Sequence, residues 1–229
     1  MSAINFPDPS THEFAEWVCF GEYYYNSKDI VCFGGRLTIE NLRNAYRKGI
    51  FPWTIEGLPL PWFCPEKRAI LEFSELHVPK SLRRIQKNNP FTFTIDKAFR
   101  QVIAMCGKIK RAHEEGTWIT RDFVESYTEL HREGEAHSVE VWENEELVGG
   151  LYGVDAGGVF VGESMFHLVP NTSKLALLFL IEHLNQRGST WLDAQVMTPH
   201  MKALGAKEIR RAQFLEKLER AQAQNLKIF

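Results

Sequence analysis

The alternation of apolar and polar positions defines three consecutive elements in the second half of the chain. Residues 159–166 form an extended apolar run with a single charge, Glu163, at its centre. Residues 172–184 are apolar around most of a helical circumference, which predicts a buried helix. Residues 190–196 return to a period of two, which predicts another strand. The pattern therefore predicts a strand, a buried helix and a second strand around one core.

Polar side chains interrupt both predicted strands. Residues two positions apart share one face of a strand, so Asp193 and Gln195 are expected to point the same way. Glu163 lies in the middle of the other strand. These groups either form a satisfied internal hydrogen-bond network or face a cleft that receives a substrate. The pattern alone leaves both interpretations open.

Residues 1–68 are predicted to form a small N-terminal α+β domain. Thr38 is a suitable N-cap for an amphipathic helix, and Gly49 is placed to end it. Pro52 cannot continue that helix, so Trp53 is expected on a turn directly after it.

A second domain is predicted over residues 69–229, with the boundary near residues 66–70, where a proline-rich stretch gives way to an apolar one. Within it, Asp96, Thr120 and Thr198 are expected to begin helices. The predicted order of elements is βαβααβββαβα, which is an α+β fold with a mixed sheet flanked by helices.

Composition excludes several classes of protein. The chain has 229 residues, 44% hydrophobic and 24% charged, as in an ordinary soluble protein. No apolar run reaches the roughly 18 residues of a membrane span, and the first residues do not resemble a secretion signal. The four cysteines lack Cys-x-x-Cys spacing, so we expect neither disulfides nor a metal site. No nucleophile–His–Asp arrangement and no phosphate-binding Gly-Lys-Ser/Thr loop is evident, and no cofactor is expected.

Basic residues recur along one predicted helix. Lys80, Arg84 and Lys87 are spaced i, i+4 and i+7, so they form a single stripe on a helix. Charge runs of this kind are usually solvated faces. A basic stripe is also what a phosphate backbone binds, and the charge pattern alone leaves nucleic-acid binding open.

The predicted meander of three strands followed by a helix and a strand is also the layout of the GNAT fold of acyl-CoA N-acyltransferases. Those enzymes bind pyrophosphate through a glycine-rich loop at the start of that helix. The equivalent residues 169–174, Val-Pro-Asn-Thr-Ser-Lys, contain no glycine. If the fold is shared, we do not expect the acyl donor to be a coenzyme A thioester.

Six short motifs in one order resemble the leucyl/phenylalanyl-tRNA–protein transferase family. They extend over nearly the whole chain and are AYRKGIFPW at 45–53, WFCP at 62–65, EGTWIT at 115–120, LVGGLYGV at 147–154, GESMF at 162–166 and LDAQ at 192–195. The resemblance implies a cytosolic monomer with a small N-terminal domain and a GNAT-like C-terminal domain. It also implies transfer of Leu or Phe from charged tRNA to an N-terminal Arg or Lys of a protein, which marks that protein for degradation.

The resemblance assigns roles to the residues singled out above. It matches Glu163, Asp193 and Gln195 to the polar centre of the family. It also implies that the basic helix with Lys80, Arg84 and Lys87 binds the tRNA acceptor stem. It also places Trp53 and Trp118 around the 3′-terminal adenosine, although a tryptophan is as often part of a hydrophobic core.

For the mechanism, we expect direct aminolysis without a covalent enzyme intermediate. Asp193 is expected to hydrogen-bond the Gln195 amide, which then orients the incoming amine. Glu163 and Asp193 also supply negative charge where a cationic side chain approaches. The final acceptor of the proton stays open.

The resemblance further implies an apolar pocket for the donor side chain. Its walls are expected to be Leu151, Phe160 and the inward face of the helix that carries Phe179 and Leu180. We expect this pocket to accept Met beside Leu and Phe, and to disfavour Ile and Val because their branching at Cβ adds bulk at its mouth. Two other classes stay open, an acetyl-CoA-dependent N-acetyltransferase and a non-catalytic RNA-binding module.

Overall fold

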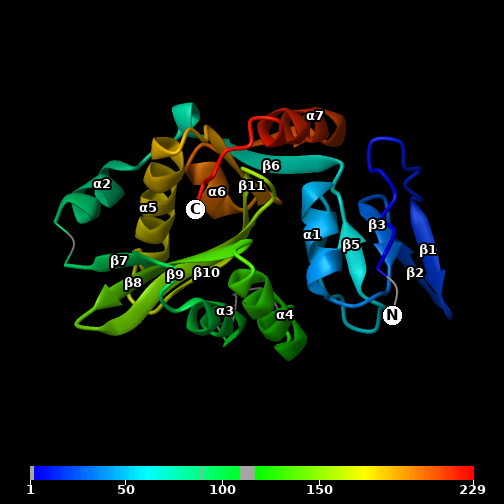
Figure 1. Cartoon of the computed structure of the whole chain (residues 1–229), viewed down its shortest axis with the longest axis horizontal. Coiled ribbons are helices and arrows are strands. Elements are labelled where there is room, and N and C mark those ends of the chain that lie inside the picture. Colours follow the sequence, from blue (N-terminus) through cyan, green and yellow to red (C-terminus); the bar gives the residue numbers. More distant parts are fainter. Residues whose placement is uncertain (1–2, 89, 109–116) are drawn as a thin grey trace.

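The computed structural model describes residues 3–88, 90–108 and 117–229. Glu115 and Gly116, which begin the EGTWIT motif, lie outside these ranges. The strands form a two-stranded hairpin, a three-stranded sheet and a seven-stranded sheet, with the two smaller sheets near the N-terminus and the large sheet at the centre of the molecule (Figure 1).

The N-terminal part is built around one short helix and two small sheets. β1 pairs with β2, and the second sheet has the order β3-β5-β4. The elements are β1 (Trp17–Phe20), β2 (Tyr23–Asn26), β3 (Ile30–Phe33), α1 (Ile39–Arg47), β4 (Phe51–Pro52) and β5 (Pro61–Phe63).

The large sheet has the order β12-β6-β11-β10-β9-β8-β7. β10 and β11 are parallel, and the other neighbours are antiparallel. Its strands are β6 (Lys67–Glu72), β7 (Thr92–Ile95), β8 (Ala136–Glu143), β9 (Glu146–Asp155), β10 (Phe160–His167), β11 (Trp191–Gln195) and β12 (Lys207–Arg210). The predicted α+β class with a mixed sheet is confirmed.

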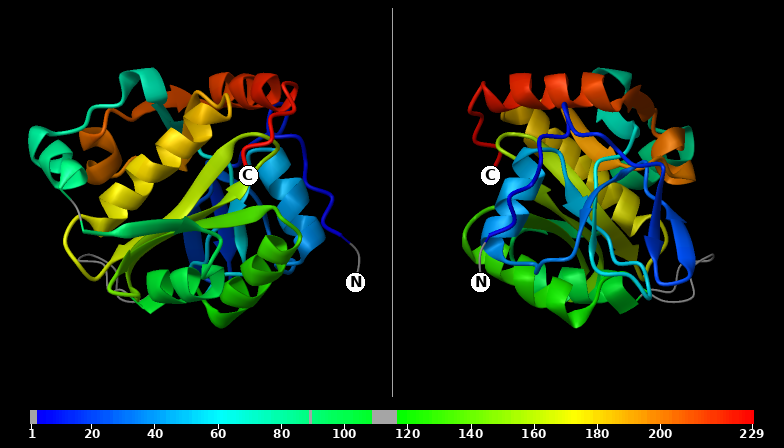
Figure 2. Two further views of the ribbon diagram at one scale, coloured as in Figure 1. Left: turned by 60° about the vertical axis from the view of Figure 1, so that its left-hand side comes forward. Right: turned by 90° about the vertical axis from the view of Figure 1, so that its right-hand side faces the viewer.

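Helices cover both faces of this sheet. Figures 1 and 2 show α5 on one face and α3 and α4 on the other, in agreement with the contacts of α5 with β8, β9 and β10 and of α3 with the same strands. The helices are η1 (Phe73–Glu75), α2 (Lys80–Lys87), α3 (Phe99–Lys108), α4 (Arg121–Arg132), α5 (Thr172–Gln186), α6 (Pro199–Ala203) and α7 (Arg211–Gln222). In the described ranges, no helix is both long and apolar enough to cross a bilayer.

The predicted order of strand, buried helix and strand is confirmed as β10, α5 and β11. Two of the predicted caps are also confirmed, because Thr38 accepts a hydrogen bond from the main-chain N–H of Asn41 and Thr198 accepts one from Met201. Gly49 follows α1 with φ +72°, and a Cβ there would lie 2.6 Å from Phe214. The close approach of α7 therefore adds a packing reason for glycine to the conformational one.

The expectation that Asp96 caps the next helix is wrong. Its carboxylate accepts a hydrogen bond from the Ser138 main chain and lies 2.7 Å from His137 Nδ1. Glu140, from β8, instead accepts hydrogen bonds from the main-chain N–H groups of Lys97 and Ala98, just before α3. A residue distant in sequence thus anchors the main chain that leads into this helix, which local spacing cannot reveal.

A single apolar cluster joins the N-terminal part to the large sheet. It includes Tyr46 of α1, Phe99 of α3, Tyr127 of α4 and Phe214 of α7. β6 begins within the predicted boundary region and pairs with β11 and β12. The division into domains at residues 68 and 69 stays a prediction.

Candidate functional site

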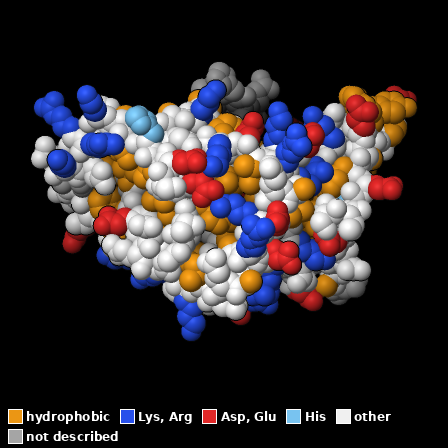
Figure 3. Space-filling model, turned by 90° about the horizontal axis from the view of Figure 1, so that it is seen from above, with side chains coloured by type: hydrophobic (Ala, Val, Ile, Leu, Met, Phe, Trp, Pro, Cys, Tyr) orange, Lys and Arg blue, Asp and Glu red, His pale blue; other side chains and the backbone are white. Residues whose placement is uncertain are grey.

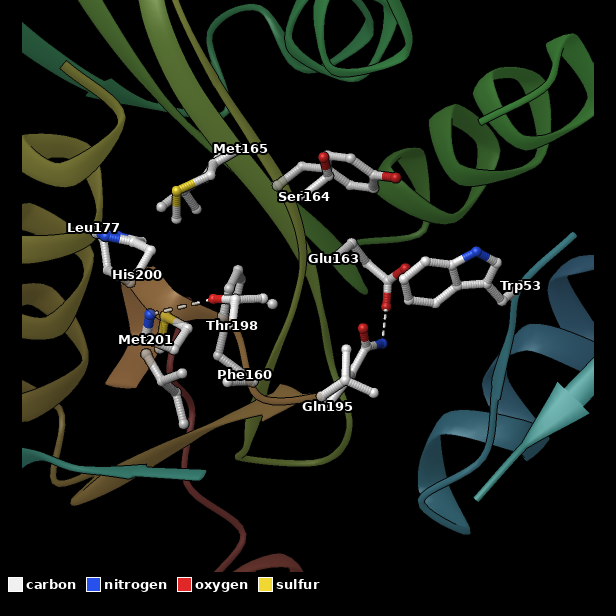
Figure 4. A pocket seen from close by; sticks show the side chains of 16 residues that line it. Trp53, Phe160, Glu163, Ser164, Met165, Leu177, Gln195, Thr198, His200 and Met201 are labelled. Atoms are coloured by element: carbon white, nitrogen blue, oxygen red, sulfur yellow. Dashed lines mark hydrogen bonds between the residues drawn. The ribbon is translucent and has the colours of Figure 1, made fainter. Parts of the chain in front are cut away.

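A cavity of about 330 Å³ lies where β10, β11 and α5 meet. This is within the size range of pockets that hold small ligands. In Figure 4, Glu163, Gln195 and Trp53 lie toward one end, and Met165, Leu177 and Met201 toward the other. The lining residues are Trp53, Leu151, Tyr152, Phe160, Gly162, Glu163, Ser164, Met165, Leu177, Leu192, Ala194, Gln195, Val196, Thr198, His200 and Met201.

Two bulges in neighbouring strands aim the polar groups into the cavity. The register of β10 against β9 shifts between Gly162 and Ser164, which makes Glu163 the extra residue. The register of β11 against β6 shifts after Asp193, and Gln195 has φ +59°. Because a bulge redirects the side chain that it carries, Glu163 and Gln195 meet across two strands that are otherwise regular.

Glu163 is the electrostatic centre of the site. Its Oε1 accepts hydrogen bonds from Tyr46 Oη at 2.7 Å and from Gln195 Nε2 at 2.5 Å. Its Oε2 is buried and has no hydrogen-bond partner among the described residues. Burial raises the pKa of Glu163 to about 7, although the hydrogen bonds from Tyr46 and Gln195 oppose the rise. The carboxyl group is therefore poised to exchange a proton near neutral pH.

The contact between Glu163 and Gln195 orients the amide of Gln195. Because its Nε2 donates to Glu163, its Oε1 is left to accept a hydrogen bond elsewhere. Gln195 lines the cavity, so a ligand amine in the cavity could donate to this oxygen. A substrate in the cavity would thus meet the Gln195 carbonyl beside the Glu163 carboxyl group.

The expected hydrogen bond between Asp193 and the Gln195 side chain is absent. Asp193 is fully buried and makes a two-point ion pair with Arg68, at 2.8 Å and 2.6 Å. Its Oδ1 also accepts the main-chain N–H of Gln195 at 2.8 Å. The bulge after Asp193 turns Gln195 to the cavity side and leaves Asp193 outside the lining. Because Arg68 neutralises its charge, Asp193 does not offer a free negative charge to a cationic side chain.

Arg68 was not singled out in the sequence, yet it holds this part of the site together. Besides binding Asp193, its guanidinium donates to the main-chain oxygen of Gly49. The same group lies 4.7 Å from the Phe51 ring centroid and 4.4 Å from that of Phe214. Arg68 is the second residue of β6, the strand next to β11, but only the fold shows that a charge at this position is buried.

The two tryptophans lie together but in different environments. Their ring centroids are 5.2 Å apart and their planes are tilted by 33°. Trp53 lines the cavity at its polar end. Trp118 is 6% exposed, packs against Phe123 and does not belong to the lining. In this geometry a ligand in the cavity meets Trp53 directly, whereas Trp118 packs against Trp53 outside the lining.

The predicted walls of the apolar pocket are only partly found in this cavity. Leu151 and Phe160 line it, whereas Phe179 and Leu180 do not. Phe179 stacks on Phe93 with ring centroids 5.2 Å apart, and Leu180 is fully buried. Leu177 is the residue of α5 that lines the cavity. Since α5 is apolar around most of its circumference, the sequence could not show which apolar side chain faces the cavity.

Other residues of the apolar end were also missed. Met165 and Leu192 come from the two strands of the centre, and His200 and Met201 come from α6, which follows β11. The ring atom Nε2 of His200 is buried without a hydrogen-bond partner among the described residues. Burial lowers the pKa of His200, with a further contribution from Lys174. The sequence offered one signal for His200 and Met201, because they follow closely after the end of a predicted strand, where functional loops often lie.

The basic stripe lies on α2, away from the cavity lining. Lys80, Arg83, Arg84 and Lys87 are all exposed, whereas Leu82 is buried in a second apolar cluster, which also contains Leu177 and Leu180 of α5. Figure 3 shows Lys and Arg side chains gathered at the end of the molecule formed by α2. Because α2 has no acidic residue, all charged side chains of this helix are positive.

The fold and the site together define a class of protein. A mixed sheet of seven strands, with a helix crossing from the meander to a parallel strand, has the GNAT-like arrangement expected from the sequence. Its centre holds a carboxylate and an amide beside an apolar cavity. Among the described residues, no group of His, Cys, Asp and Glu is arranged to hold a metal ion. The class is thus an α+β protein whose seven-stranded mixed sheet has a GNAT-like order of elements and a buried polar centre.

Comparisons with known proteins define the family. The model of the leucyl/phenylalanyl-tRNA protein transferase family matches residues 70–219, and that of its N-terminal domain matches residues 35–66. The chain belongs to this family.

Proteins of several bacteria that are similar to this chain carry the name leucyl/phenylalanyl-tRNA–protein transferase. That of Pseudoalteromonas atlantica is 47% identical over 84% of this chain and 82% of its own length. That of Flavobacterium johnsoniae is 45% identical over 85% of this chain and 92% of its own length. The protein of Pectobacterium atrosepticum is 41% identical over 96% of this chain and 88% of its own length.

Proposed function

We propose that the chain transfers the leucyl or phenylalanyl group of a charged tRNA, and also a methionyl group, to the N-terminal Arg or Lys of a protein, which marks that protein for degradation. The observation that carries this proposal is the cavity, which is apolar at one end and ends at Glu163 and Gln195 at the other. An aminoacyl ester needs both parts, an apolar wall for its side chain and polar groups for the reacting carbonyl. Membership of the transferase family supports the same conclusion.

The donor occupies the cavity with its side chain among Leu151, Met165 and Leu177. Its carbonyl then lies near Gln195, and the terminal adenosine lies against Trp53, because aromatic rings stack well on bases. The body of the tRNA extends toward α2, whose basic side chains attract the phosphate backbone. The chemistry requires no cofactor, since the ester is already activated. We propose a monomer as the active unit.

The reaction is direct aminolysis. An α-amino group has a pKa near 8, so a useful fraction is neutral at pH 7. The neutral amine donates a hydrogen bond to the Gln195 carbonyl and attacks the ester carbonyl carbon. The N–C bond forms and the C–O bond to the ribose breaks. Glu163 accepts the amine proton at Oε2 and returns it to the departing ribose oxygen. Because charged tRNA is a cytoplasmic substrate, we place the protein in the cytoplasm.

The alternative functions receive less support. Residues 169–174 lead into α5 without a glycine, so the start of this helix lacks the loop in which acyl-CoA enzymes of the fold hold pyrophosphate. A module that only binds RNA would not need a buried carboxylate and amide facing a cavity.

A direct assay tests the proposal. The protein is incubated with radiolabelled Phe-tRNA and an acceptor protein that begins with Arg, and the label in protein is measured. The same acceptor with an acetylated N-terminus serves as the matched control. We expect label only in the acceptor with the free amine. Absence of label in it, or consumption of acetyl-CoA instead, would contradict the proposal.

A charge reversal on α2 separates tRNA binding from chemistry. Changing Lys80, Arg84 and Lys87 together to Glu is expected to weaken tRNA binding and to flatten its dependence on salt, because fewer counterions are released. A 3′-aminoacyl-adenosine donor does not reach α2 and should react as before. Filter binding at several salt concentrations and transfer assays with both donors measure this. Equal loss with both donors would remove α2 from the tRNA site.

A substitution in the cavity tests the placement of the donor side chain. Leu177→Phe adds bulk to the wall, so transfer of Phe should fall about tenfold relative to Leu, since methylene-scale fits discriminate by about 1–3 kcal/mol. Phe179→Leu on the same helix, outside the lining, is the control and should keep the ratio. Initial rates with Leu-, Phe-, Met-, Ile- and Val-charged tRNA measure the effect. An unchanged ratio in Leu177→Phe would place the donor elsewhere.

A further inference from the structure

Two buried tyrosines connect helices from distant parts of the chain to the Glu163 carboxylate. Tyr46 comes from α1 and Tyr127 from α4, and their exposed fractions are 1% and 0%. Their hydroxyl oxygens are 2.5 Å apart, and the Tyr46 oxygen is 2.7 Å from Glu163 Oε1. A packing role alone would be met by phenylalanine, so the hydroxyl groups require a separate explanation.

The number of protons fixes the direction of these hydrogen bonds. A phenol has a single O–H, and that of Tyr46 is donated to the carboxylate of Glu163. The proton between the two hydroxyls must therefore come from Tyr127. Burial raises the pKa of both tyrosines well above the ordinary value, so neither gives up its proton at neutral pH. The chain of donors runs from Tyr127 through Tyr46 to Glu163.

The same counting distinguishes the two oxygens of Glu163. A carboxylate oxygen has two in-plane lone pairs, and Oε1 receives one donor from Tyr46 and another from Gln195. No partner among the described residues binds Oε2. An arriving proton therefore finds an open lone pair on Oε2 and none on Oε1.

We propose that Tyr46 and Tyr127 are positioning residues for aminoacyl transfer, a one-way series of O–H donors that occupies Glu163 Oε1 and so directs the amine proton to Oε2. This inference rests on the proposed function. The tyrosines do not touch the substrate; they fix the rotation of the carboxyl group and favour its ionised form against the effect of burial. The other charged groups that act on Glu163 are Asp193 and Arg68, which neutralise each other in their ion pair.

The test is the pH dependence of single-turnover transfer with saturating Phe-tRNA. Tyr46→Phe removes a donor to the carboxylate, so the rise of the rate with pH should move up by about one pH unit, and the rate at pH 7 should fall about fivefold. The amine of the acceptor titrates identically in both enzymes, so the difference belongs to the protein. Tyr24→Phe, which removes an exposed hydroxyl on β2, is the matched control and should keep the wild-type profile.

Tyr127→Phe tests the series one step further from the carboxylate. Its profile should shift in the same direction by a smaller amount, because Tyr46 keeps its own bond to Glu163. The double variant should match Tyr46→Phe alone, since Tyr127 acts only through Tyr46. Additive shifts would overturn the series of donors, as would a loss of rate that is equal at every pH.

Failure of this inference is distinct from failure of the proposed function. If the wild-type protein transfers Phe and both tyrosine variants keep its pH profile, the positioning role is wrong and the transferase function stands. If the wild-type protein transfers no label at any pH, the function itself is wrong. Thermal unfolding of each variant shows whether it is folded, and Tyr127→Phe serves as the second test if Tyr46→Phe is not.

Discussion

Replacing Glu163 by glutamine is expected to slow aminoacyl transfer by about two to four orders of magnitude, the usual contribution of a general base. Glutamine keeps the shape and can still accept hydrogen bonds from Tyr46 and Gln195, but it cannot take the proton of the amine. Binding of Phe-tRNA should change little, because the uncharged parts of the cavity are unaltered. Single-turnover rates and tRNA affinities measured on the same preparation separate the two effects.

Glu163→Gln is also expected to be more stable than the wild-type protein at high pH. The folded-state pKa of Glu163 is raised from 4.5 to about 7, so between these values the folded state binds more protons than the unfolded state. Wild-type stability therefore falls as pH rises through this window, by up to about 3 kcal/mol. Glu163→Gln has no such group, so relative to the wild type it should gain stability between pH 5 and pH 8.

Urea unfolding at both pH values checks this, and Glu129→Gln, an exposed site on α4, is the control for removing one charge. If Glu163→Gln transfers Phe within about threefold of the wild-type rate, Glu163 is excluded as the proton acceptor. A stability difference that does not change with pH would mean that the carboxyl group does not titrate in this window.

Asp193→Ala is expected to destabilise the protein by about 3–5 kcal/mol, because it leaves the Arg68 guanidinium buried without its partner. The main-chain N–H of Gln195 also loses its acceptor. The melting temperature should fall by about 10 °C for a chain of this size. Loss of activity should follow from loss of structure around Gln195, in contrast with the effect on turnover alone expected if Asp193 bound the Gln195 side chain.

Replacing both partners provides the control. In Arg68→Met/Asp193→Leu no charge is left unpaired, so much of the stability should return, while transfer stays slow because the Gln195 main chain is still not held. Urea unfolding of the single and double variants measures the coupling. A cost of less than about 1 kcal/mol for Asp193→Ala would show that Arg68 finds another partner or water.

Several parts of the fold followed from local pattern. Period-two alternation predicted β11, and apolar residues around most of the helical circumference predicted α5. Burial of an element selects apolar residues at most of its positions, so it can be recognised in the sequence. Thr38 and Thr198 were recognised as N-caps because the donor that each one satisfies lies only three residues away. Asp96 was misjudged for the converse reason, since the main chain before α3 is held by Glu140, which is distant in sequence, on β8.

The polar centre was found in the sequence, but its connections were not. Glu163, Asp193 and Gln195 stood out because polar residues in apolar strands are rare. The i and i+2 rule placed Asp193 and Gln195 on one face, and the bulge between them reversed that relation. A single inserted residue changes the face of every side chain beyond it. Arg68 escaped notice because nothing in its local sequence shows that it is buried, and no local pattern shows that the Tyr46 hydroxyl group reaches Glu163.

The sequence by itself determined which residue types the protein has for chemistry, the order of its strands and helices, and its family. Those properties depend on composition, on short-range periodicity and on motifs. Only the tertiary structure decided which groups act on each other: Glu163 rather than Asp193 holds the Gln195 amide, Asp193 belongs to Arg68, and Leu177 rather than Phe179 or Leu180 faces the cavity. Each of these contacts joins residues on different strands or depends on the rotation of a helix that is apolar around most of its circumference, and neither is encoded in local spacing.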